Sequence, residues 1–313
     1  MIGTAFPPLL ALLALAAAGP PGAFPADEDL IGATSTHVVQ PDESLIEIAR
    51  DRDVGFNEIV AANPDLDPFV PGTGARVVIP TAWILPREVA PGIVAVNLSE
   101  MRLYYSFSPD GKSAPVLVTF PIGIGDEGWE TPVGTFEVVE RLVNPAWHVP
   151  ASIQKENPDL PPVVPAGPDN PLGTHALRLS SRTILIHGTN LPYAIGRKAS
   201  HGCLRLYPED IVQFFPLVPR GARVLIVREP VKVGVKGDRV FVEVHEDSMA
   251  MVDTALRARQ LLFERGLLER VSKGKLERAL DRKSGLPVDV TAEGFGPRSL
   301  PERGPERGPA KPG

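Results

Sequence analysis

The feature that most constrains the fold of this chain is an alternation of side-chain types between residues 101 and 107. Every second residue there is large and apolar, and the residues between them are of mixed polarity. The apolar set is Met101, Leu103, Tyr105 and Phe107, and the other set is Arg102, Tyr104 and Ser106. Because successive side chains of a β-strand point to opposite faces of a sheet, this period of two predicts a strand with its apolar face in a core.

Several other short apolar runs predict further strands of the same sheet. They lie at residues 116–118, 136–139 and 176–179, and turn-forming residues separate the first of them from the 101–107 strand. One helix is expected near Pro208 to Phe215. We therefore predict a mainly β domain over residues 93–227, with a β sandwich or barrel-like architecture.

The segment from Asn144 to Gly173 interrupts this domain, because it is rich in proline and shows no regular period. Long irregular segments inside compact domains are usually functional loops. We expect this one to form a lid or a substrate wall.

The length of 313 residues allows two or three domains, and 43% hydrophobic with 22% charged residues is ordinary for globular proteins. The net charge of −6 gives no basic surface for nucleic acid, so we predict no nucleic-acid partner. The 35 prolines gather in connecting segments and at the C-terminus, which indicates small modules joined by stiff linkers.

Residues 1–26 are interpreted as a secretory signal peptide, with an apolar stretch from Leu9 to Ala18 and an A-x-A motif at its end. Ten apolar residues are too few to span a bilayer, so no membrane span is predicted in the mature protein. Residues 1–8 lack the usual positive charge, which leaves an uncleaved apolar tail as the alternative and the cleavage position open. Export is the interpretation we adopt.

A small module with the order strand, helix, helix, strand is predicted over residues 36–80. Its strands are His37–Val39 and Arg76–Ile79, and Asp42 or Ser44 is expected to cap the first helix. Asn57 is expected to cap the second helix.

Residues 228–290 are expected to form a small accessory α+β domain. A strand pair at 231–235 and 239–245 precedes two amphipathic helices at 253–265 and 274–283. The stretch 291–313 has little to bury, and we expect a disordered tail.

Cys203 is the only cysteine of the chain, so in an exported protein it has no partner for an intramolecular disulfide. It follows Ser200, His201 and Gly202, and a second histidine, His187, lies sixteen residues upstream. A cysteine with a separately placed histidine can attack a carbonyl, with the thiolate as nucleophile and the histidine as general base. Gly202 leaves room for the substrate, and its backbone N–H can stabilise an oxyanion. A lone cysteine can also be an inert buried residue, but this pattern favours catalysis.

The stretch from His187 to Arg205 resembles the active-site signature of L,D-transpeptidases, the cysteine enzymes that cross-link peptidoglycan. That signature is His-Gly-Ser/Thr, a loop, and Ser/Thr-His-Gly-Cys with an arginine two positions later. Further blocks resemble the branch that attaches Braun lipoprotein to the cell wall. They lie at residues 96–98, 102–104, 131–136, 144–147 and 167–173.

The resemblance implies a role for each residue of the signature. Cys203 is the expected nucleophile, and His187 is the expected general base, oriented by the backbone carbonyl of Gly188. Gly202 supplies a backbone oxyanion donor and His201 assists. No cofactor is expected, and no metal site, since the remaining histidines share no ligand spacing. Substrate contacts are expected from Arg205, Ser200, Thr189, Tyr193 and Trp147.

The 36–80 module resembles a LysM domain, a binder of glycans that contain N-acetylglucosamine. By that resemblance its groove is shaped by the loop Pro41–Glu43 and by the turn at Asn63–Pro64. Glycan binding rests on this resemblance and not on a visible site.

Together these resemblances imply an exported peptidoglycan L,D-transpeptidase in the periplasm, associated with the cell wall. The cysteine would attack the carbonyl before the terminal D-alanine of a tetrapeptide stem, release D-alanine and leave a thioester. An amine of another stem, or a lysine of a wall-anchored lipoprotein, would then resolve the thioester. The expected partners are therefore glycan strands, stem peptides and such a lipoprotein.

Three alternatives follow from the same residues. Water as acceptor would make the enzyme an L,D-carboxypeptidase. A non-catalytic LysM-type scaffold is opposed by the intact His187, Gly202, Cys203 and Arg205. A papain-like hydrolase would place its cysteine before its histidine, the reverse of the order here.

Overall fold

The computed structural model describes residues 29–108, 112, 115–181, 183–246 and 251–295. The predicted signal peptide at 1–26 and residues 296–313 of the predicted tail lie outside these ranges. Within them, no helix combines the length and hydrophobicity needed to cross a membrane.

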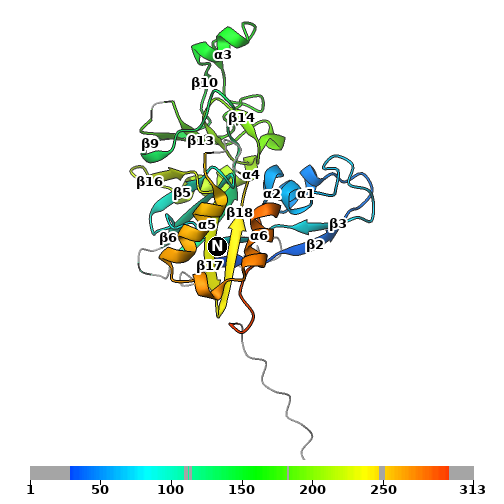
Figure 1. The fold of residues 1–313 in the computed structure, drawn as a ribbon. Coiled ribbons are helices and arrows are strands. Elements are labelled where there is room, and N and C mark those ends of the chain that lie inside the picture. The colour runs from blue at the N-terminus through cyan, green and yellow to red at the C-terminus, as the bar shows by residue number, and fades with distance from the viewer. Residues whose placement is uncertain (1–28, 109–111, 113–114, 182, 247–250, 296–313) are drawn as a thin grey trace, which may run out of the picture.

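An eight-stranded sheet forms the centre of the molecule, which confirms the prediction of a mainly β domain (Figure 1). Its strand order is β15-β13-β12-β9-β16-β5-β6-β7. The pairs β13–β15 and β5–β16 are parallel, and the other pairs are antiparallel. The strands are β5 (Ile93–Asn97), β6 (Arg102–Phe107), β7 (Val116–Pro121), β9 (Gly134–Val143), β12 (His175–Leu179), β13 (Leu185–His187), β15 (Leu204–Arg205) and β16 (Arg223–Val227).

The two faces of this sheet pack against different parts of the chain. On one face, α4 (Pro208–Leu217) covers the predicted apolar set, and Phe214 lies edge-on to Tyr105. On the other face, Tyr104 lies in a second core with the N-terminal helices. Arg102 and Tyr104 are both fully buried. Strand β6 therefore has no face in solvent.

The N-terminal unit has the predicted order β2 (Ser35–Val38), α1 (Leu45–Asp51), α2 (Phe56–Ala62) and β3 (Arg76–Ile79), with β2 and β3 antiparallel. Ser44 caps α1, where its hydroxyl accepts from the N–H of Glu47. The predicted cap of α2, Asn57, is wrong, because the helix begins two residues earlier than that cap requires. Gly55 is the N-cap, and its N–H donates to Glu58, while the amide of Asn57 donates to the Glu100 carbonyl. Strands β1 (Leu30–Gly32) and β4 (Ala82–Ile84) pair beside this unit.

The C-terminal unit contains the three-stranded sheet β17-β18-β19 and two helices. Thr291, the first residue of the predicted tail, is instead buried, and its hydroxyl accepts from the N–H of Val240. The elements are β17 (Val231–Lys236), β18 (Arg239–Val244), α5 (Thr254–Glu264), α6 (Lys273–Arg282) and β19 (Val288–Asp289).

A buried ion pair joins the N-terminal unit to the sheet. The Arg102 guanidinium on β6 lies 2.9 Å from the Glu58 carboxylate on α2, and both side chains are buried. The same guanidinium lies over the Trp83 ring, 4.1 Å from its centroid, and the Trp83 indole N–H donates to Glu58. A buried ion needs such partners, because removing one of them leaves the other charge uncompensated.

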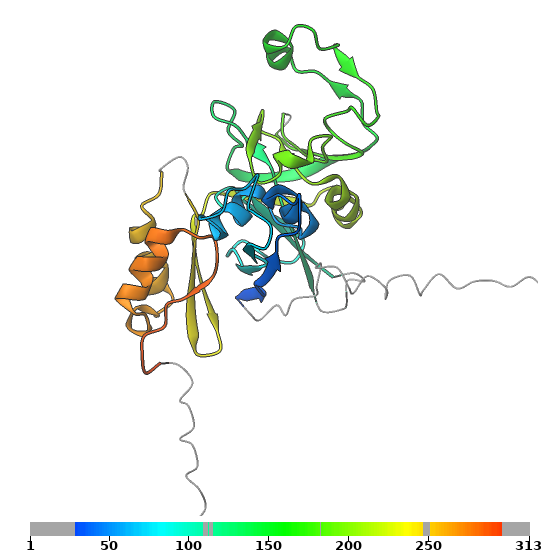
Figure 2. The same cartoon turned by 90° about the vertical axis from the view of Figure 1, so that its right-hand side faces the viewer.

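The segment from Asn144 to Gly173 forms an arm that projects from the body in both views (Figure 1, Figure 2). It is a hairpin of β10 (Trp147–His148) and β11 (Val163–Val164), with α3 (Ala151–Glu156) between them. At its base the buried Asn170 amide donates to the Pro145 carbonyl at 2.9 Å. The segment is therefore less irregular than its sequence predicts.

Candidate active site

The parallel pair β13–β15 positions the predicted catalytic residues. In its register Ile186 lies opposite Leu204, and His187 lies opposite Arg205. Ile186 and Leu204 are both buried in the core of the sheet. Because strand side chains alternate, His187 and Arg205 share the other face, and Cys203 directly precedes β15 on that same side.

The His187 imidazole is buried and held by the next residue of the chain. Its Nδ1 lies 2.6 Å from the Gly188 carbonyl, which can only accept, so Nδ1 carries the proton and Nε2 is free to accept one. Burial, and secondly the nearby Arg205 cation, lower the pKa of His187 to about 3. The ring is therefore neutral at neutral pH and able to act as a base. The predicted orienting contact from Gly188 is present.

The Cys203 thiol is half-buried, with Sγ 3.5 Å from the Thr183 carbonyl oxygen. Burial raises the pKa of this thiol; a backbone hydrogen bond from Leu185 and the Arg205 charge act in the opposite direction. The resting pair is therefore a neutral thiol and a neutral imidazole.

The loop before Cys203 is fixed by its own hydrogen bonds. The Ser200 hydroxyl donates to the Cys203 carbonyl at 2.7 Å, and the Thr131 hydroxyl donates to the Gly202 carbonyl at 3.0 Å. Gly202 has φ +96°, a value that side-chain-bearing residues rarely adopt, and an added Cβ would lie 3.3 Å from the Ile184 methyl. This backbone conformation explains why glycine precedes the cysteine.

Two of the predicted substrate contacts are turned into the protein. Ser200 is buried, and its hydroxyl is bonded within the loop. Thr189 is buried as well, and its hydroxyl accepts from the N–H of Leu191. We therefore interpret both as loop scaffold and not as substrate contacts. Tyr193 is exposed in the 3-10 turn Pro192–Ala194, and Trp147 lies on β10 of the arm.

His201 makes two contacts that sequence reasoning missed. Its ring packs against Trp129 with centroids 4.8 Å apart, and its Nε2 lies 3.1 Å from the Glu156 carboxylate on α3. Trp129 lies just before the 131–136 block, so the presence of a tryptophan beside that block was an available signal. Glu156 is 45 residues from His201, and nothing in the sequence indicates their contact.

Arg205 offers a cation to a ligand on the face shared with Cys203 and His187. Its Nε is buried and has no hydrogen-bond partner in the part of the chain that the structure describes. Burial lowers the pKa of this guanidinium, which is nonetheless charged at any physiological pH.

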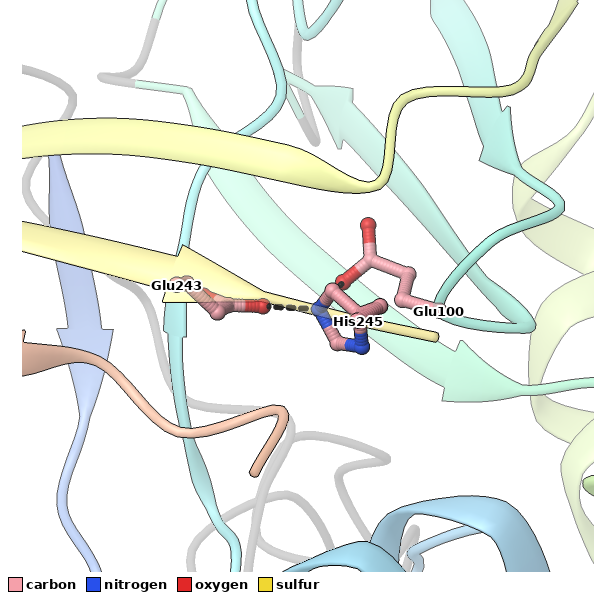
Figure 3. Close-up of side chains that lie close together, drawn as sticks. All are labelled: Glu100, Glu243 and His245. Carbon is pink, nitrogen blue, oxygen red and sulfur yellow. Dashed lines mark hydrogen bonds and ion pairs between the residues drawn. The ribbon is translucent and has the colours of Figure 1, made fainter. Parts of the chain in front are cut away.

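Three potential metal ligands, Glu100, Glu243 and His245, lie together away from this site, with ligand atoms within 4.8 Å of one another (Figure 3). The Lys232 ammonium lies 2.5 Å from the Glu100 carboxylate and 2.7 Å from that of Glu243. The Tyr104 hydroxyl also donates to Glu100. A cation is thus already supplied by the protein, and we assign no metal to this cluster.

Comparison with known proteins gives consistent matches to one family. Residues 91–226 match the YkuD family model, described as the L,D-transpeptidase catalytic domain. The "Probable L,D-transpeptidase YcfS" of Escherichia coli K12 is 35% identical over 291 residues, which cover 88% of this chain and 89% of that protein. The "Probable L,D-transpeptidase ErfK/SrfK" of Salmonella typhimurium is 39% identical over 253 residues, 76% of this chain and 79% of that protein. The "Probable L,D-transpeptidase YbiS" of Escherichia coli K12 is 38% identical over 256 residues, 77% and 81% of the two chains.

Proposed function

The chain belongs to the L,D-transpeptidase family and is a peptidoglycan L,D-transpeptidase, and we propose that Cys203 is its nucleophile in a thioester mechanism. The observation that carries this proposal is the grouping of Cys203, His187 and Arg205 on one face of β13–β15. The Gly188 carbonyl fixes the tautomer that leaves Nε2 of His187 free to accept a proton.

The first half-reaction forms a thioester with the tetrapeptide stem. As the Cys203 sulfur bonds to the stem carbonyl, His187 takes the thiol proton and transfers it to the D-alanine nitrogen, whose bond to the carbonyl breaks. The Gly202 and Cys203 N–H groups stabilise the oxyanion, a contribution that is worth about 10²–10³ in rate for one donor in comparable enzymes. Arg205 holds a carboxylate of the stem.

The second half-reaction returns the acyl group to an amine. The acceptor nitrogen bonds to the carbonyl, the carbon–sulfur bond breaks, and the amine proton passes through His187 to the sulfur. The acceptor is an amine of another stem or a lysine of a wall-anchored lipoprotein.

Intact-protein mass spectrometry with a disaccharide-tetrapeptide tests the proposal. We expect an adduct equal to the stem minus D-alanine, with release of D-alanine, and no adduct on the Cys203→Ala variant. Folded wild-type protein that gives neither product would rule out this role for Cys203.

We also propose that the N-terminal unit binds glycan as a LysM module, and that the enzyme is exported and works at the cell wall in the periplasm. The strand, helix, helix, strand order and the β2–β3 pairing support the first proposal. The Asn63 side chain is bonded to the backbone of Val78 and so holds the turn that is expected to shape the groove.

Co-sedimentation of the Cys203→Ala protein with insoluble peptidoglycan tests glycan binding. Oligomers of N-acetylglucosamine should compete for the bound protein. Unchanged sedimentation at saturating oligomer would contradict the LysM assignment. Fractionation of producing cells tests export, which a purely cytoplasmic protein would contradict.

A further inference from the structure

The turn between α1 and α2 of the N-terminal unit contacts the chain on both sides of Cys203. Residues 54–57, at the end of this turn and the start of α2, are hydrogen-bonded to residues 195 and 196 before the cysteine and to Tyr207 after it. No role assigned above uses these contacts.

The contact before the cysteine is made by backbone groups. The first two N–H groups of α2, those of Phe56 and Asn57, donate to the carbonyls of Ile195 and Gly196 at 3.2 Å each. The first N–H groups of a helix have no acceptor within the helix, and here the loop between the two catalytic residues supplies the acceptors. Ile195 and Gly196 are buried, so these bonds also satisfy carbonyls that lie away from water.

Gly196 allows the two backbones to approach this closely. It has φ +75°, and a Cβ added to it would lie 2.2 Å from the Phe56 nitrogen, which is shorter than any normal contact. Beside it, the Arg197 guanidinium lies over the Phe56 ring, 3.7 Å from the ring centroid. A cation over a ring face is attracted to it, so side chains reinforce the backbone contact.

The contact after the cysteine joins the same turn to the start of α4. The Tyr207 hydroxyl donates to the Val54 carbonyl at 3.1 Å, and both residues are buried. Nearby, the Arg50 guanidinium donates to the two carboxylate oxygens of Glu209 at 2.8 and 3.0 Å. The N-terminal unit therefore holds the chain before and after the cysteine.

The turn is itself fixed to the central sheet. The buried Arg102 guanidinium on β6 donates to the Asp53 carbonyl at 2.9 Å and to the Glu58 carboxylate at 2.9 Å. The loop is also bonded to the sheet, since the Gly196 N–H donates to the Ile122 carbonyl at 3.1 Å. A shift of the turn relative to the sheet would therefore break bonds at several points.

The chain between the two contacts carries the reacting groups. Residues 197–206 include β14 (Lys198–Ser200), the proposed oxyanion donor Gly202 and Cys203. Misplacing reacting groups by about 1 Å can cost about 10²-fold in rate. We propose that the α1–α2 turn positions the nucleophile, and that Gly196 and Tyr207 are the positioning residues through which it acts. The inference rests on the proposed thioester mechanism and does not depend on glycan binding by the N-terminal unit.

The test compares two glycines that share a backbone conformation and differ in their surroundings. Gly196→Ala places a methyl group against the Phe56 nitrogen, so the loop and α2 must separate. Gly92→Ala is the matched control, because Gly92 has φ +78° and no atom within 4 Å of an added Cβ. Acyl-enzyme formation on the full-length protein is followed by mass spectrometry over a range of disaccharide-tetrapeptide concentrations. A weakened glycan contact would raise the concentration that gives half the limiting rate and leave the limiting rate unchanged.

A second pair of variants removes one hydroxyl each. Tyr207→Phe deletes the hydrogen bond to the Val54 carbonyl. Tyr105→Phe is its control, because the buried Tyr105 has no hydrogen bond from its hydroxyl to any residue within the described ranges. This pair decides the question if Gly196→Ala does not fold.

We expect Gly196→Ala to lower the limiting rate of acyl-enzyme formation by about 10²-fold and Gly92→Ala to keep the wild-type rate. Tyr207→Phe should lower it by about threefold to tenfold, the effect of one hydrogen bond, and Tyr105→Phe should not change it. Unfolding in urea verifies that each variant is folded in the assay. A purely structural contact would lower the free energy of unfolding and leave the limiting rate of the folded protein unchanged, and that result would overturn the positioning role. Absence of any adduct on the wild-type protein would instead overturn the thioester mechanism, and this inference with it.

Discussion

Cys203 can be titrated without interference, because the chain has no other cysteine. An ordinary cysteine has a pKa of about 8.5 and is therefore about 3% thiolate at pH 7. Burial raises the pKa of Cys203, so its thiolate fraction at pH 7 is smaller still. Burial also lowers the pKa of His187 to about 3, so above about pH 4 the ring is neutral and no imidazolium is present to stabilise a thiolate.

The rate of alkylation by iodoacetamide measures this state directly, because only the thiolate reacts. We expect the rate to increase about tenfold per pH unit from pH 5 to beyond 8, with no plateau, because the thiolate fraction of a thiol grows tenfold per unit below its pKa. A plateau between pH 5 and 8 would show a preformed thiolate–imidazolium pair and would refute the reasoning.

The His187→Ala variant provides an independent check on the same point. If His187 acts as a base only during turnover, alkylation in the variant should follow the wild-type pH profile. Acyl-enzyme formation should fall by about 10²–10⁴, the range typical of a lost general base. Slower alkylation at pH 7 in the variant would instead mean that the histidine already activates the resting thiol.

Three further variants test the packing and the backbone. Lys232→Met leaves two buried carboxylates without their cation and should lower the free energy of unfolding, measured in urea, by about 3–5 kcal/mol. The control Lys273→Met, at an exposed position, should lower it by about 0.5 kcal/mol or less. A loss of similar size in both variants would contradict the buried network. Burial raises the pKa of Asp53 to about 6 and that of Asp210 well above its ordinary value. The native state therefore keeps protons that the unfolded chain has lost, and its free energy of unfolding falls as pH rises from about 4. Asp210→Asn should stabilise the protein at pH 8 but not at pH 4, and an equal change at both pH values would argue against this. Gly202→Ala forces a Cβ onto a positive-φ residue and should slow acyl-enzyme formation by about 10²-fold or more, and an unchanged rate would remove the proposed backbone oxyanion donor.

The alternation at residues 101–107 predicts strand β6 and its apolar face, but not what covers its second face. Arg102 and Tyr104 are buried there because α2 and the C-terminal unit pack on that side. The partners of these residues, Glu58 and Lys232, are 44 and 128 residues away in the chain. No local sequence pattern predicts such contacts, since they depend on how whole units of the chain pack against one another.

The candidate site follows the same division between local and long-range information. Cys203, His187 and the Gly188 carbonyl could be predicted, because the motif fixes their spacing and the strand pair fixes their face. The directions of the Ser200 and Thr189 hydroxyls could not be predicted, because a motif gives the residue type and not the direction of its hydroxyl. The contact between Glu156 of the arm and His201 depends on the position of the arm relative to the sheet, which the composition of the segment does not determine.

The electrostatics of the site also bear on how the lone thiol resists oxidation. Oxidation to the sulfenic acid proceeds from the thiolate, as substrate attack does. Burial that raises the pKa of Cys203 therefore suppresses both reactions in the resting enzyme. Only a bound carbonyl placed beside the free Nε2 of His187 gives the thiol proton a base to move to while the sulfur forms its new bond. The neutral resting pair thus makes the reactivity of the nucleophile conditional on substrate, and it avoids the desolvation penalty of two buried ions in the empty site.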